Sequence, residues 1–175
     1  MNKLEEIQLI IKEVLLEYKK RTSIEEWLIE NEIMLGELLD PKESFEYKKE
    51  GKGLFTYKDT SGDVYFVRLV YQALNEPYLE LKTGWFENNQ ISKPKYDPPL
   101  APNSTAKDGN KRSNTVAKIY QSEIIPLFIN QELTDVFIIK PISFSRYQFA
   151  KRLVEKFTPP ELVIQYQEYQ ITINK

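Results

Sequence analysis

The chain has 175 residues, of which 41% are hydrophobic and 13% aromatic, which fits one domain with its own core, or one domain with an appendage. It contains no cysteine and no histidine. Disulfides, thiolate nucleophiles and sulfur-bound metals are therefore excluded, and the usual general base and commonest zinc ligand are absent as well. Any catalysis would rest on carboxylates, tyrosines, lysines and backbone dipoles.

The N-terminus lacks the apolar core of a signal peptide, because charged residues interrupt its apolar residues every few positions. No run approaches the roughly 18 apolar residues that a membrane-spanning helix needs. We therefore expect a cytoplasmic protein without a membrane role. The net charge is -2, with an acidic first 50 residues and a mildly basic remainder. The excess of basic over acidic residues between 93 and 118 could serve a phosphate-bearing ligand.

Two amphipathic helices are expected at the start of the chain. Apolar residues recur at helical spacing over 3–20, and the second helix, over 24–35, follows a capping box formed by Ser23 and Glu26 and ends at Gly36. Together they predict a helical N-terminal arm over residues 1–40. The arm is rich in large apolar side chains: Leu4, Ile7, Ile11, Val14, Leu15, Trp27 and Leu28.

From Phe45 the pattern changes to alternating β-branched and aromatic residues, which predicts a sheet. The expected strands are 45–48, 54–58, 64–72 and 78–86. Short connections with turn residues separate them, so we expect an antiparallel meander. The strand over 64–72 is apolar at both parities, which is typical of a strand covered on both faces.

A long loop is expected over 88–112, because this stretch contains four prolines and few large apolar residues. Ser113 or Asn114 then caps a helix that reaches about residue 130 and is kinked or tightened by Pro126. A strand over 135–142, a helix over 144–157 and a single final strand over 162–173 follow. The sequence thus predicts an α+β domain over 44–175, a mainly antiparallel sheet with two C-terminal helices packed on it.

This element order resembles the Gcn5-related N-acetyltransferase (GNAT) fold, in which the helix after the meander presents its N-terminus to the pyrophosphate of acetyl-CoA. The resemblance covers about residues 45–175. One glycine, Gly109, stands where the family has a loop with two or three. In the second helix of the family pattern, Tyr147 takes the place of an Asn, Ala150 and Leu153 match, and Val154 replaces the Tyr that often acts as general acid.

The chain also resembles uncharacterised proteins of tailed bacteriophages. The likeness is carried by the helix from Ser113 to Phe128, by Ile138–Ile139, by Arg146 to Leu153, and by the short amphipathic stretch Ile10 to Leu15. It implies a phage-encoded protein in the cytosol of a bacterial host and carries no function with it.

The basic helix start near Ser113 is a candidate anion or cofactor site, because free amides, the helix dipole and nearby cations would all attract a phosphate. The alternative is a solvated loop that happens to be basic. The candidate residues are Lys107, Gly109, Lys111, Arg112, Ser113 and Asn114.

Aromatic and basic residues also interleave over Tyr47–Lys58, as on surfaces that stack nucleic-acid bases, although a strand with inward rings and outward lysines gives the same pattern. The pI near 5.5 disfavours a nucleic-acid partner. The N-terminal arm offers the leading functional hypothesis: its apolar stripe binds a protein partner or a second copy. We therefore expect a non-catalytic interaction module without a cofactor. The alternative is an acyl-CoA-dependent N-acyltransferase of GNAT type that uses acetyl-CoA.

Overall fold

The structure is a computed structural model that describes residues 39–96, 101 and 108–175. Residues 39–175 form one compact unit. The predicted helices over 3–20 and 24–35, and with them most of the N-terminal arm over 1–40, lie outside the described residues.

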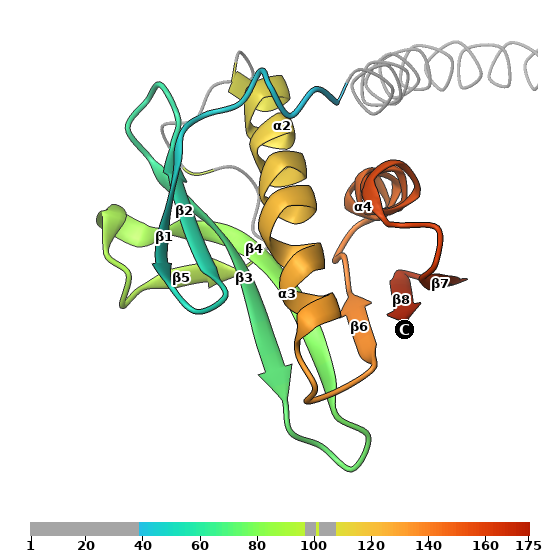
Figure 1. Cartoon of the computed structure of the whole chain (residues 1–175). Coiled ribbons are helices and arrows are strands. Elements are labelled where there is room, and N and C mark those ends of the chain that lie inside the picture. The colour runs from blue at the N-terminus through green and yellow to red at the C-terminus, as the bar shows by residue number, and fades with distance from the viewer. Residues whose placement is uncertain (1–38, 97–100, 102–107) are drawn as a thin grey trace, which may run out of the picture. The chain divides into compact units, whose positions relative to one another are not determined.

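An eight-stranded, mostly antiparallel sheet forms the centre of the unit, in the order β1-β2-β3-β4-β6-β8-β7 (Figure 1). The only parallel pair in the described residues is β4 with β6, and β5 pairs with β4 beside this path. The strands are β1 Tyr47–Gly51, β2 Leu54–Lys58, β3 Val64–Gln72, β4 Tyr78–Phe86, β5 Pro94–Tyr96, β6 Val136–Ile139, β7 Val163–Gln167 and β8 Gln170–Asn174. The predicted α+β class with a mainly antiparallel sheet is confirmed.

The predicted final strand over 162–173 is wrong, because the chain turns back within it. β7 and β8 form a hairpin whose turn residues are Glu168 and Tyr169, and Tyr169 has a φ of 53°. Positive φ is uncommon for a bulky side chain, and a turn of this kind normally carries Gly or Asn. The sequence therefore shows no turn signal at this point. Between 88 and 112, the structure places the strand β5 and the first turn of a helix.

The helix after the meander begins at Gly109, about one turn before the predicted start at Ser113 or Asn114. It consists of α2 (Gly109–Ile119), a π-helical turn η3 (Tyr120–Ile124) and α3 (Ile125–Asn130). Pro126 lacks the N–H that an α-helix needs and crowds the preceding turn. The widened turn accommodates it, with the Ile125 N–H bonded to the Tyr120 carbonyl. Pro126 thus follows a wider turn, so the expected tightening is wrong, and the alternative of a kink stays a prediction.

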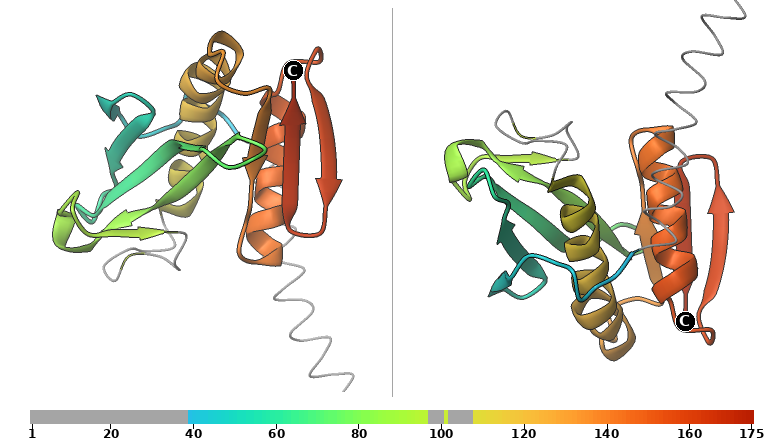
Figure 2. Two further views of the ribbon diagram at one scale, coloured as in Figure 1. Left: turned by 90° about the horizontal axis from the view of Figure 1, so that it is seen from below. Right: turned by 90° about the horizontal axis from the view of Figure 1, so that it is seen from above.

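The second helix, α4 (Phe144–Phe157), agrees with its predicted range. The Ser143 hydroxyl caps it by accepting a hydrogen bond from the Arg146 N–H. Both helical segments lie on one side of the sheet, as both views of Figure 2 show. The Tyr120 hydroxyl in η3 and the Thr158 hydroxyl after α4 lie 2.7 Å apart and bond to each other. The two segments therefore share one layer.

The main core lies between this helical layer and the sheet. Inward residues of the strands, such as Val67, Phe137 and Ile173, are fully buried against Ile119, Ile124, Phe128, Leu153 and Val154. On the opposite face a smaller cluster forms where Phe66 stacks on Phe86 and meets Tyr96 of β5 edge-on. This explains why β3 is apolar at both parities. β5 reaches the cluster because Gly84 lacks a side chain: a Cβ there would lie 2.0 Å from the Lys95 carbonyl oxygen.

Leu153 provides a test of this core. Its side chain is 1% exposed, so Leu153→Ala should reduce the free energy of unfolding by roughly 2 to 5 kcal/mol. Lys151, two positions earlier on the outer face, has a side chain that is 40% exposed and lies 3.9 Å from Glu155. Lys151→Ala is the matched control and should change the free energy of unfolding by no more than about 0.5 kcal/mol. Urea unfolding of both variants measures this, and equal costs would show that the buried face is assigned wrongly.

Candidate functional site

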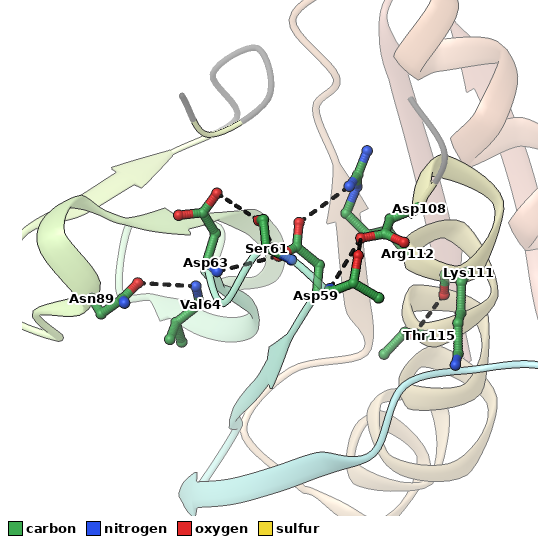
Figure 3. Close-up of polar contacts among 10 residues, drawn as sticks. Asp59, Ser61, Asp63, Val64, Asn89, Asp108, Lys111, Arg112 and Thr115 are labelled. Atoms are coloured by element: carbon green, nitrogen blue, oxygen red, sulfur yellow. Dashed lines mark hydrogen bonds and ion pairs between the residues drawn. The ribbon is translucent and has the colours of Figure 1, made fainter. Parts of the chain in front are cut away.

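The turn between β2 and β3, Asp59–Asp63, stands next to the start of α2 (Figure 3). The Asp59 carboxylate organises this turn: its Oδ1 accepts hydrogen bonds from the Ser61 N–H at 3.0 Å and the Asp63 N–H at 3.2 Å. Gly62 supplies the positive φ, 86°, that the turn requires. The Asp59 side chain therefore stabilises the turn that joins β2 to β3.

Two polar links join this turn to α2. The Arg112 guanidinium donates to the other Asp59 oxygen at 3.2 Å, with side-chain exposures of only 7% and 0%. The Asp108 carboxylate, at the start of α2, accepts hydrogen bonds from both the N–H and the hydroxyl of Thr60. Asp108 and Arg112 stand one helical turn apart and both are buried. The first turn of α2 is therefore fixed to the β2–β3 turn by a buried charged cluster.

The next turn of α2 holds the start of the described chain. The Asn114 side chain accepts from the Asp40 N–H at 3.1 Å and donates to the Glu43 carbonyl at 2.9 Å. The Thr115 hydroxyl accepts from the Phe45 N–H at 2.9 Å and donates to the Lys111 carbonyl at 2.6 Å. The segment 40–45 is thus fixed along α2 before it enters β1.

The structure buries some of the predicted anion-site residues and leaves others accessible. Arg112 and Asn114 are buried and bonded within the fold, and Ser113 is half-buried inside α2, so its amide is not at the helix end. Gly109 starts the helix without a positive φ, and a Cβ there would meet only the Arg112 guanidinium at 3.9 Å. Lys107 lies outside the described residues. Anion binding at this helix start stays a prediction, and Asp108 places a carboxylate at the N-cap position of the same helix.

Lys111 is exposed and borders an open hollow of about 700 Å³. The hollow lies between the segment before β1, the end of β2 and the turn after β4. Its charged lining mixes both signs, with Lys48, Lys58 and Lys111 against Glu46 and Glu50. The Lys111 ammonium also lies 4.7 Å from the centre of the Phe45 ring. This mixed lining gives the hollow no clear preference for an anion.

Aromatic side chains near the site serve packing. Phe55 and Tyr57 are buried, so their rings are not available to stack nucleic-acid bases. The Tyr47 hydroxyl donates to Glu123 at 2.9 Å, and burial together with this carboxylate raises the pKa of Tyr47 to about 12. Burial likewise raises the pKa of Tyr120 above its usual value. Both tyrosines therefore stay protonated at neutral pH.

The sequence interpretation missed Asp108 and Thr60 and gave Arg112 no partner. One signal was present: Asp108 and Arg112 are four positions apart, the spacing that places two side chains on one helix face. That spacing becomes informative only when the helix is extended back to Gly109. The helix-poor residues Gly109 and Asn110 discourage this extension. The partner residues Asp59 and Thr60 are distant in sequence, so no local pattern identifies them.

Comparisons with protein-family models, with curated proteins and with solved structures find no match to this chain. Among the described residues, no group of three or more carboxylates, histidines or cysteines is placed to hold a metal ion. The described helices also include none that is long and apolar enough to cross a membrane.

The Arg112–Asp59 pair can be tested by substitution. Arg112→Met should lower the free energy of unfolding by roughly 3 to 5 kcal/mol, because it leaves the Asp59 carboxylate buried without its cation. Adding Asp59→Asn should recover part of this loss, since the buried negative charge is then removed.

The matched control is Lys95→Met, which breaks an exposed ion pair with Glu87 at 3.7 Å. This change should cost less than about 1 kcal/mol. Urea unfolding of the four variants, including Asp59→Asn alone, gives the coupling energy. An additive double variant would contradict a direct interaction between the two buried side chains.

Proposed function

We propose that the chain is a non-catalytic protein-interaction module, encoded by a bacteriophage as its resemblance implies. The observation that carries the proposal is a group of exposed apolar side chains where α4 begins and the β7–β8 hairpin turns. Ile142 is 67% exposed and Phe144 is 53% exposed. Tyr147, in the first turn of α4, meets the partly exposed Tyr169 edge-on at 6.1 Å. Apolar side chains gathered on a surface in this way are typical of interaction sites.

The contacts of α2 also favour a non-catalytic role. The charged and amide side chains that a phosphate would need, Arg112 and Asn114, bond instead to Asp59 and to the backbone of residues 40–43. Val154, at the position where the GNAT pattern has its tyrosine acid, is completely buried. A proton donor at that position on α4 would face the core rather than a substrate.

The alternative function is an acyl-CoA-dependent N-acyltransferase of GNAT type. The strand order favours this alternative, because β4 and β6 are parallel neighbours joined through α2 and α3. α2 therefore starts at the end of the meander, as the resemblance expects for a helix that presents its N-terminus to acetyl-CoA. The buried indole N–H of Trp85, at the end of β4, has no hydrogen-bond partner among the described residues.

A thermal-shift assay with acetyl-CoA separates the two functions. A bound ligand at 100 times its dissociation constant adds about 2.7 kcal/mol to the stability of the folded protein. We expect no shift of the melting temperature with acetyl-CoA at millimolar concentration. Lys111→Glu is the variant to compare, because Lys111 is exposed, whereas Arg112→Glu would place two carboxylates together in the interior. A shift in the wild type that Lys111→Glu abolishes would rank the acyltransferase alternative above the interaction module.

The N-terminal arm provides the test of association. If its apolar stripe binds a partner protein or a second copy, Ile11→Asp should release that partner and leave the unfolding of residues 39–175 unchanged. If the stripe is instead part of the core, the buried carboxylate would unfold the domain. Sedimentation of the full chain, with its near-ultraviolet circular dichroism as the folding control, distinguishes the two. Global unfolding of Ile11→Asp, with a monomeric wild type, would refute association through the arm.

A further inference from the structure

The two edges of the sheet have opposite character. β1 carries Lys48, Lys49 and Glu50, and its pairing with β2 is interrupted by an irregularity between Lys49 and Gly51. Charged side chains, lysine above all, and bulges are the features that prevent an edge strand from pairing with another chain. The β1 edge is therefore protected against edge-to-edge association.

β7 has none of these protective features. Its five residues, Val163–Gln167, include no charged residue and no proline, and all five pair with β8 in unbroken register. Val163 is 55% exposed, Ile164 is half-buried, and the other three residues of the strand are exposed. β7 ends the strand order, and within the described part of the chain no strand pairs with its outer side (Figure 2).

The hairpin geometry determines which backbone groups this edge presents. The two-residue turn closes at the pair Gln167 and Gln170, the pair that exchanges hydrogen bonds across such a turn. In an antiparallel ladder the bonding pairs alternate with non-bonding pairs. Gln167, Gln165 and Val163 therefore direct their N–H and C=O groups toward β8. Ile164 and Tyr166 direct theirs outward, where they are available to another strand.

We propose that β7 pairs with β7 of a second copy, antiparallel and centred on Gln165, so that the two sheets continue as one. This interface rests on the proposed function, because the chain acts in it by association. In this register Ile164 lies opposite Tyr166 of the second copy, and the four outward backbone groups of each strand are satisfied by those of the other. Ile164 packs on the core side, so the pairing extends the apolar layer beside α4.

The occupant is a second copy because the strand complements itself. A two-fold axis at Gln165 places identical uncharged amides opposite one another, and no like charges face each other along the strand. Pairing of β7 with β1 of another copy would produce open chains of molecules. The lysines and the irregularity of β1 oppose that pairing. The remaining arrangement, β7 with β7, closes after two copies.

The test uses the symmetry of this interface in the full-length chain. On the two-fold axis, Gln165→Lys places lysine against lysine and Gln165→Glu places glutamate against glutamate. Each variant alone should raise the dimer dissociation constant at least about tenfold, because like charges lie opposite each other. An equimolar mixture of the two variants should restore the dimer, because each pair then has opposite charges. Sedimentation velocity over a concentration series measures all three.

Lys48→Glu, an exposed charge change on β1, is the matched control and should leave the dimer unchanged. Three results would overturn the inference: a wild type that stays monomeric at all concentrations, a dimer that survives both Gln165 variants, or a mixture no more associated than either variant alone. A dimer that only Ile11→Asp dissociates would also overturn it, and association through the arm would then stand. If Ile11→Asp leaves the dimer intact while the Gln165 variants dissociate it, association through the arm is refuted and the β7 interface stands.

Discussion

The buried ion pair between Arg112 and Asp59 anchors the first turn of α2 to the β2–β3 turn. Removing both charges from water is costly. A buried ion pair is stable only when further hydrogen bonds satisfy the remaining polar atoms of the two side chains. Asp59 also accepts backbone hydrogen bonds from its own turn, so local contacts as well as the helix hold the carboxylate in place. A second carboxylate, Asp108, lies at the positive end of the helix dipole, which stabilises a negative charge there. The cluster thus combines a rigid turn, a cation and a helix terminus.

This charged cluster limits ligand binding at the start of α2. The same helix turn that anchors α2 also fixes residues 40–45 through Asn114 and Thr115, so two distant segments of the chain depend on one short stretch. A ligand that took over Arg112 would have to replace Asp59 and leave that carboxylate buried without its cation. The energetic cost of this exchange favours a structural role for the cluster. Exposed apolar side chains, Ile142 and Phe144 among them, lie away from this cluster, where α4 begins.

The elements that sequence patterns predict well are those whose signal is local. β2, β3 and β4 agree with their predicted ranges because alternating burial fixes which residues face the core, and α4 agrees because Ser143 caps it and Pro159 follows it. The start of α2 could not be read in this way, since Gly109 and Asn110 disfavour a helix and its contacts with Asp59 and Thr60 are distant in sequence. The β7–β8 turn could not be read either, because Tyr169 adopts a backbone conformation that its residue type avoids. The candidate site shares this limit: its residue types were visible, but their partners were not.

The order of the last strands explains why β7 is exposed at all. The chain places β8, the final strand, between β6 and β7, so that Ile171 and Ile173 become completely buried while the earlier strand is left outside. Both strands of the hairpin are rich in β-branched and aromatic residues, and only their position in the sheet separates them. A strand that stays on the outside usually carries charge to prevent pairing. Here the polar positions of β7 are glutamines, which keep the strand compatible with water and do not repel an identical strand. The two edges of the sheet therefore differ in side-chain charge and in the regularity of their pairing, two properties that protect an edge strand from pairing with another chain.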